Sequence, residues 1–144
     1  MIPTGLPTLV LTVGSRACAI PLTHVIETMR PLPIESVADM PPFVLGVSIV
    51  RGAPIPVVSV SALVGAPAGR PPTRFVTLLV DTRSVVLAVD AVEGIVTLDA
   101  ATLEAMPPLL AHAGAGVVAA IAPLDDRLLL VLQAARIVPT REPS

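Results

Sequence analysis

The sequence predicts an all-β protein, and three observations support this fold class. The apolar runs are short and end in glycine, proline, aspartate or serine, and they are rich in Val, Ile, Leu and Thr, which favour strands. No window of ten or more residues carries an apolar stripe at helical spacing with a polar opposite face. A length of 144 residues suits one domain or two small lobes, and two small barrels side by side would fit the spacing of the runs.

The first half of the chain predicts five strands. Residues 9–13 alternate in polarity, residues 14–16 form a turn, and residues 17–20 run back. Further strands are expected over residues 25–29, 44–50 and 55–60, followed by a short helical turn over residues 61–64.

Residues 65–74 hold two glycines and three prolines, which indicates an internal linker between two lobes. The strands expected after it span residues 75–80, 84–89, 92–98, 117–121 and 127–132. Helical turns are expected over residues 99–105 and 133–138. The folded unit is expected to span residues 8–138, with flexible ends at 1–7 and 139–144.

Composition excludes several classes of protein and site. A single cysteine, Cys18, rules out an intramolecular disulfide and a four-thiolate zinc site, and only His24 and His112 remain for a transition metal. A net charge of −2 without a charge run argues against a nucleic-acid binder, and the only aromatics, Phe43 and Phe75, give no base-stacking platform. Neither a metal nor another cofactor is expected.

The chain is unusually apolar. Charged residues make up 14% of it, against about 25% in a typical soluble domain, and the mean hydropathy is +0.86. Such a chain is expected to expose apolar patches of the kind that mark contacts with partner proteins. The longest charge-free stretch, Ala105–Leu124, contains prolines and glycines that favour loops over a membrane span. The first residues lack a positively charged region, so we expect a cytoplasmic protein.

Motifs of known enzymes occur only in incomplete form. Residues 114–119 match a loose dinucleotide fingerprint, but the pattern that follows them favours a strand where a helix is needed. Residues 46–50 begin like a nucleophile elbow and end in valine. Asp81 lies in an apolar hairpin, and Asp90 and Glu93 are three residues apart at a strand end, a spacing typical of a solvated bend. We therefore predict no catalytic residues.

Arg51 is the exceptional residue of the first half. It follows the apolar strand over 44–50 at a tight turn, and Gly52 permits that turn. Arginine offers a planar fork of donors on a stem that packs against apolar surface, which suits an interface anchor. An equally good interpretation from the residues alone is a charge that keeps a loop soluble.

Several motifs together give a resemblance. A Val-x-Glu element lies at residues 25–27, a Leu-Gly, Arg-Gly and Pro-Val-Val hairpin at residues 45–65, and a Val-Asp-x-Val element at residues 89–93. An apolar hairpin strand over residues 126–132 follows. In this order and spacing the chain resembles the CheW-like family of chemotaxis coupling domains over about residues 8–138.

The resemblance implies a fold and a function. It implies two five-stranded SH3-like β-barrels around separate cores, with short helical turns. It also implies a non-catalytic adaptor that couples the cytoplasmic tips of methyl-accepting chemoreceptors to the regulatory domain of the histidine kinase CheA. The partner-binding residues that it implies are Val25, Glu27, Arg51, Gly52, Asp90 and Glu93.

The chain departs from the family pattern at three positions. Ser59 replaces the aspartate after Pro-Val-Val, Ser48 stands where asparagine is frequent, and Gly94 stands where a β-branched residue is usual. An adaptor of a twitching-motility or other chemosensory pathway is the alternative within the fold. A small β-barrel hydrolase using Asp81, or Asp90 with Glu93, is the alternative of another class; it requires a carboxyl pKa raised by burial.

Overall fold

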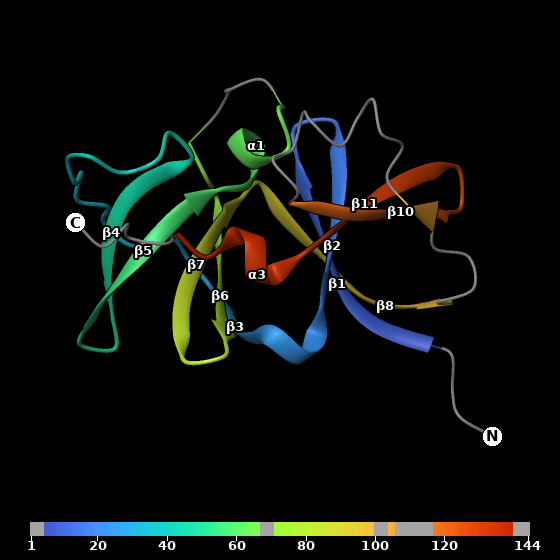
Figure 1. Cartoon of the computed structure of the whole chain (residues 1–144), viewed down its shortest axis with the longest axis horizontal. Helices are drawn as coiled ribbons and strands as arrows, with labels where there is room; N and C mark the ends of the chain where they lie inside the picture. The colour runs from blue at the N-terminus through green and yellow to red at the C-terminus, as the bar shows by residue number, and fades with distance from the viewer. Residues whose placement is uncertain (1–4, 67–70, 100–103, 106–116, 140–144) are drawn as a thin grey trace.

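The computed structural model describes residues 5–66, 71–99, 104–105 and 117–139 as two antiparallel-rich β-sheets side by side (Figure 1). One sheet has six strands in the order β8-β1-β2-β11-β10-β9, and the other has five in the order β3-β6-β7-β5-β4. The predicted all-β class and its two five-stranded lobes are confirmed, and the sixth strand, β9, adds only two residues to one of them.

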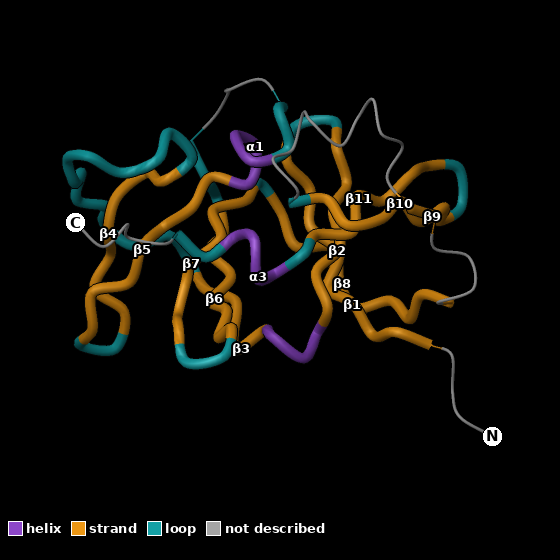
Figure 2. Tube along the Cα trace, viewed as in Figure 1, coloured by secondary structure: helices purple, strands orange, loops and turns teal. Residues whose placement is uncertain are grey.

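The bounds of the elements follow the chain. The six-stranded sheet consists of β1 (Gly5–Val13), β2 (Arg16–Pro21), β8 (Ala91–Asp99), β9 (Glu104–Ala105), β10 (Val118–Leu124) and β11 (Arg127–Leu132). The five-stranded sheet consists of β3 (Val25–Met29), β4 (Val44–Val50), β5 (Ala53–Ser59), β6 (Arg74–Val80) and β7 (Arg83–Val89). The helical segments are η1 (Leu22–His24), α1 (Val60–Leu63) and α3 (Ala134–Ile137), and they lie along the boundary between the sheets (Figure 2).

The chain passes between the sheets twice. It leaves the six-stranded sheet through η1 and returns through Asp90, between β7 and β8. The segment 65–74, which was expected to link two lobes, instead follows α1 and leads to β6, so it joins two strands of the same sheet. The segment therefore connects α1 and β6 within one lobe.

The two sheets repeat one arrangement. In the five-stranded sheet, β3 is followed by the β4–β5 hairpin, α1 and the β6–β7 hairpin. In the six-stranded sheet, β8 is followed by the short β9, the β10–β11 hairpin and α3, and the β1–β2 hairpin from the start of the chain completes it. A parallel pair joins the hairpins in both, β5 with β7 and β11 with β2. Positions in one sheet can therefore be matched to positions in the other.

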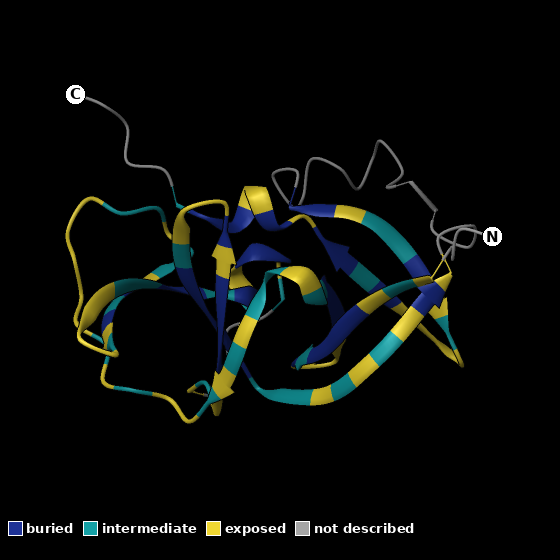
Figure 3. Cartoon of the chain, turned by 90° about the horizontal axis from the view of Figure 1, so that it is seen from below, coloured by how far each residue is buried: buried dark blue, intermediate teal, exposed yellow. Residues whose placement is uncertain are grey.

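The largest core lies between the sheets. It combines buried residues of both, such as Leu11 and Ile20 from one and Leu78 and Leu87 from the other, with Ile137 of α3. Two smaller clusters fill the inner faces of the individual sheets (Figure 3 shows buried residues along the strands). Each lobe thus has the separate core that was expected, and the other apolar faces of the two sheets are in addition buried against each other.

Most strands agree with the sequence-based prediction. Strands β3, β4 and β11 have the predicted bounds, and α3 lies within its predicted range. The helical turn expected over residues 99–105 is wrong at Glu104–Ala105, whose backbone pairs with β10 as strand β9. An alanine-rich stretch favours a helix locally, but pairing with a neighbouring strand overrides that propensity. Gly5–Pro7, expected in a flexible end, pair with Thr97–Asp99 of β8.

Some expectations concern residues outside the described ranges. They include His112, the glycines at 114 and 116, and the segment 100–103. Within the described ranges, none of the helices is both long enough and apolar enough to span a membrane.

Candidate functional site

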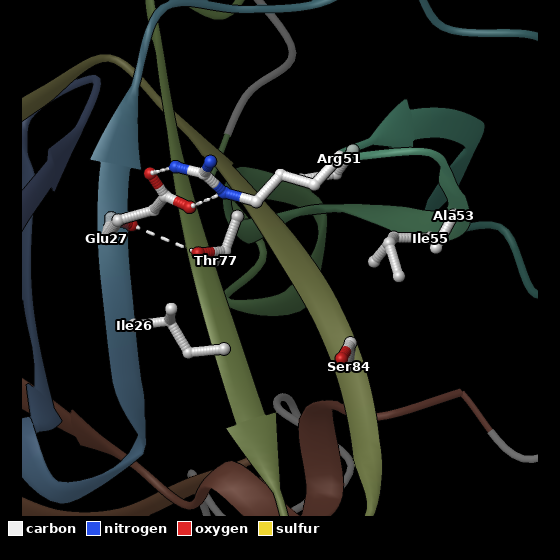
Figure 4. A pocket seen from close by; sticks show the side chains of 8 residues that line it. Ile26, Glu27, Arg51, Ala53, Ile55, Thr77 and Ser84 are labelled. Atoms are coloured by element: carbon white, nitrogen blue, oxygen red, sulfur yellow. Dashed lines mark hydrogen bonds and ion pairs between the residues drawn. The ribbon is translucent and has the colours of Figure 1, made fainter.

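The Arg51 side chain reaches across the five-stranded sheet to Glu27. Its Nε donates to Oε2 of Glu27 at 2.8 Å, and its Nη2 donates to Oε1 at 2.7 Å (Figure 4). This is a bidentate pair, in which the planar guanidinium matches the two carboxylate oxygens. Glu27 lies on β3 and Arg51 follows β4, and these strands are the two edges of the sheet. The pair therefore bridges the seam between the sheet edges.

The β4–β5 turn presents Arg51 in an unusual backbone conformation. Arg51 has φ +50° and Gly52 has φ +85°, as both central residues of a two-residue type I′ hairpin require. The other non-glycine residues with positive φ in the described chain are Asp39, Asp81 and Asp125, and aspartate tolerates this region better than arginine does. An arginine held in this region is a local strain of the kind found at functional sites.

A β-bulge on β3 places Glu27. Val25 pairs with Leu78 and Glu27 pairs with Thr77, which leaves Ile26 as the extra residue. Because of the bulge, Ile26 and Glu27 extend toward the same side, as Figure 4 shows. The Thr77 hydroxyl donates to the backbone oxygen of Glu27 at 3.3 Å and holds the strand there.

A hollow of about 260 Å³ lies beneath the pair. Ile26, Val50 and Ile55 supply most of its apolar lining, and Thr77 lies at its floor. Ile26 is 54% exposed, an unusual value for a large apolar side chain on a strand. The Arg51 side chain is 76% exposed and that of Glu27 is 27% exposed. Since an ion pair this open to water contributes little stability, the pair chiefly places charge beside exposed apolar surface.

The pair sets the ionisation of both groups. The hydrogen bond from Arg51 lowers the pKa of Glu27 below 4.5, an effect that partial desolvation opposes. The same hydrogen bond raises the pKa of Arg51. Both groups therefore stay charged at neutral pH.

The structure brings together four of the six predicted site residues. Glu27, Arg51 and Gly52 surround the hollow or its turn, and Val25 precedes the bulge with its side chain against the core between the sheets. Asp90 and Glu93 do not join them, because Asp90 lies between β7 and β8 and Glu93 lies on β8 of the six-stranded sheet.

Asp90 connects three segments of the chain. Its Oδ2 accepts a hydrogen bond from the Gly14 amide at 2.6 Å, and its own amide donates to the Thr12 oxygen at 3.0 Å. The Thr73 hydroxyl donates to the Asp90 backbone oxygen. Asp90 thereby fixes the β1–β2 turn to the point where the chain crosses between the sheets.

Glu93 forms a second bidentate pair. Arg127 donates to Glu93 through Nη1 at 2.9 Å and through Nη2 at 2.5 Å. The hydrogen bond lowers the pKa of Glu93. The hydrolase hypothesis required a raised carboxyl pKa, so Glu93 fails that requirement. Asp81, the other candidate, lies in the exposed β6–β7 turn with φ +56°. In the described residues, His, Cys, Asp and Glu form no group of three that could bind a metal.

Sequence reasoning missed Ile26, Thr77 and Arg127. Arg127 was visible after the Asp-Asp turn, but only the folded chain shows that it reaches Glu93, 34 residues away.

The structure also explains two departures from the family pattern. The Ser59 hydroxyl accepts a hydrogen bond from the Ala62 amide at the start of α1, and Ser48 donates to the Pro33 oxygen at 2.7 Å.

Comparisons with known proteins agree with this architecture. A family model described as the CheW-like domain matches residues 7–142. The chemotaxis protein CheW of Rhizobium meliloti (strain 1021) is 27% identical over 132 residues, which cover 90% of this chain and 85% of that protein. The crystal structure of the scaffolding protein TtCheW from Thermoanaerobacter tengcongensis superposes with a TM-score of 0.80 at 21% identity, covering 90% of this chain and 89% of that one.

Proposed function

The chain belongs to the CheW-like domain family, and from this we propose that it is a non-catalytic adaptor of chemotaxis signalling. It couples the cytoplasmic tips of chemoreceptors to a CheA-type histidine kinase. Residues 8–138 act as one unit, because the core between the sheets needs both of them. The adaptor works in the cytoplasm, at the membrane only through its receptor partners.

The exposed Arg51 above an apolar hollow is the observation that carries this proposal. Its pair with Glu27 uses Nε and Nη2, which leaves Nη1 for an acceptor on a partner. Ile26 and the lining of the hollow supply apolar contact area for a helix of the partner. In such docking the apolar area gives affinity, and the charges fix the register.

The remaining predicted residues support this surface in different ways. Gly52 allows the turn that presents Arg51, and Val25 anchors β3 where the bulge begins. Asp90 and Glu93 contribute to partner binding indirectly, because Asp90 holds the β1–β2 turn and Glu93 holds Arg127.

A paired binding experiment tests the proposal. A receptor-tip fragment and a kinase regulatory domain are each used to pull down the full chain and its Arg51→Glu variant. We expect the wild type to bind both, and the variant to lose at least one contact by about tenfold or more, since reversal of a central charge repels Glu27 and the partner together. Arg83→Glu is the matched control, because Arg83 is an exposed arginine beside another turn of the same sheet.

Two results would contradict the proposal. If the wild type binds neither fragment, the adaptor function is wrong. If Arg51→Glu binds both as tightly as Arg83→Glu does, Arg51 is not part of the surface.

A further inference from the structure

A second cleft, of about 480 Å³, lies on the six-stranded sheet. We propose that it binds an exposed helix of a partner protein in which a carboxylate stands beside aliphatic side chains. Its most informative lining residues are Arg16, Ile121, Arg127, Leu128 and Leu130. This proposal stands on the cleft alone and does not depend on the function proposed above.

The floor of the cleft continues a buried apolar face. In the parallel β2–β11 pair, Leu130 lies opposite Cys18, so Leu128 and Arg16 are the next neighbours on the same face. Cys18 is fully buried in the core between the sheets, and Leu130 packs against that core. Leu128, one step further out, is 61% exposed. The apolar face thus extends beyond the part that the five-stranded sheet covers.

Two carboxylates hold the walls of the cleft in place. Asp90 binds the amide of Gly14 in the turn that precedes Arg16, and Glu93 binds the guanidinium of Arg127. Gly14 and Arg127 both line the cleft, so its two basic walls are fixed before a partner arrives. Asp90 and Glu93 are therefore positioning residues of this cleft, which a partner need not touch.

The charged side chains that line the cleft favour an acidic occupant. The charged residues that line it, Arg16 and Arg127, are both basic. Arg127 is paired with Glu93 and also lies near Asp125, whereas Arg16 takes part in no ion pair within the described residues. Arg16 is thus the group available to a carboxylate of the partner. The described lining residues include no aromatic side chain on which a nucleobase could stack.

The spacing of the lining accommodates a helix. Arg16 and Leu128 lie on adjacent strands, which are about 4.8 Å apart. On a helix, residues three or four positions apart place their Cβ atoms about 5–6 Å apart. A glutamate and a leucine one turn apart on a helix therefore match Arg16 and Leu128.

The probe is a synthetic amphipathic helix with leucine and glutamate on one face. Its counterpart carries lysine at every glutamate position. Each is titrated into the isotope-labelled full chain, and amide chemical shifts are followed by NMR. We expect the acidic peptide to shift the amides of residues 14–17 and of Leu128, and the lysine peptide to bind at least about tenfold more weakly.

The variants Arg16→Glu and Leu128→Ser are compared with Arg83→Glu. Arg83 follows the β6–β7 turn as Arg16 follows the β1–β2 turn, so it is the equivalent residue of the other sheet. We expect both cleft variants to weaken the acidic peptide by about tenfold, and Arg83→Glu to leave its binding unchanged. Leu128→Ser removes no charge, so it tests the cleft if charge reversal at Arg16 prevents folding.

Three outcomes would overturn the inference. They are the absence of shifts at the cleft, equal binding of the lysine peptide, and shifts confined to the hollow below Arg51. Each would show that an acidic helix does not recognise this surface.

Discussion

The two sheets have the same strand arrangement but carry different residues at equivalent positions. Each has an edge strand with a bulge, at Ile26 on β3 and at Glu93 on β8, and each bridges its seam with an arginine–glutamate pair. In the five-stranded sheet the arginine is in the turn itself, and its side chain is 76% exposed. In the six-stranded sheet Asp125 takes that turn position, and Arg127 lies two residues later with a side chain 43% exposed.

The two arginines therefore differ in how much of the side chain is open to solvent. A charge pair spans the seam of each sheet, and the arginine at the turn itself is more exposed to solvent than the arginine two residues later. Arg51 is displayed, whereas Arg127 is engaged through both Nη atoms with Glu93. The sheets can therefore share a fold and still offer two different surfaces.

The interiors of the sheets differ as much as their seams. Phe75 fills the five-stranded sheet, and its matched position on β1 is Thr8, which is also fully buried and donates to the Val96 oxygen. We expect Phe75→Ala to cost about 3–5 kcal/mol of unfolding free energy, because it leaves a cavity. Thr8→Val should cost only about 1 kcal/mol, the value of one hydrogen bond. Urea denaturation of both variants measures this contrast, and equal losses would contradict it.

The next effect concerns equivalent positions on β4 and β10, the outer strands of the two matching hairpins. Gly46 on β4 has φ +150°, and a Cβ there would lie 2.2 Å from the Glu35 oxygen, since the Glu35 backbone pairs with Val47. Ala120 occupies the matched position on β10, beside β9. Gly46→Ala should cost about 2–4 kcal/mol through strain and crowding. Ala120→Gly should cost about 0.5–1 kcal/mol through chain entropy, and thermal melts of the two variants distinguish these values.

The crossing between the sheets at Asp90 is held by hydrogen bonds to the β1–β2 hairpin. Asp90→Ala removes the acceptor of the Gly14 amide, and we expect a loss of about 1–2 kcal/mol. Asp90→Asn keeps an oxygen at that position and should lose less. Amide hydrogen exchange at Gly14 reports the bond directly, and unchanged protection in Asp90→Ala would show that the bond does not hold the turn.

The seam pairs should make a small, pH-dependent contribution. Because the folded pKa values of Glu27 and Glu93 lie below 4.5, the unfolded chain binds protons more readily than the folded one. The contribution is present above pH 4.5 and is lost as the pH falls through the lowered folded values. A variant with both residues changed to glutamine should therefore show a flatter acid limb in its stability curve. High salt should shrink the difference, and an unchanged acid limb would contradict these assignments.

The smallest expected effect is at Cys18, between the sheets. Burial raises its pKa to about 12, against a minor opposing effect of Arg16. We expect no measurable modification by a thiol reagent at neutral pH while the sheets stay together, and rapid modification once urea separates them. Fast labelling of the native protein would show that the core between the sheets opens readily.

Local sequence determined the elements. Strands β3, β4 and β11 were predicted with their bounds, because short runs of β-branched and aliphatic residues between turn signals have few alternatives. The motif order also indicated the family and directed attention to Glu27 and Arg51. These signals are carried by neighbouring residues, so they can be seen without the fold.

Tertiary structure alone decided how these elements are used. The Glu27–Arg51 and Glu93–Arg127 pairs join residues 24 and 34 positions apart, and both depend on an edge strand approaching a distant hairpin of its own sheet. Only the pairing of strands turned Glu104–Ala105 into β9, and only the stacking of the sheets created the large core between them, beside the core within each sheet. Contacts of this kind arise when distant segments bury a common surface, and a local pattern cannot specify which segments those are.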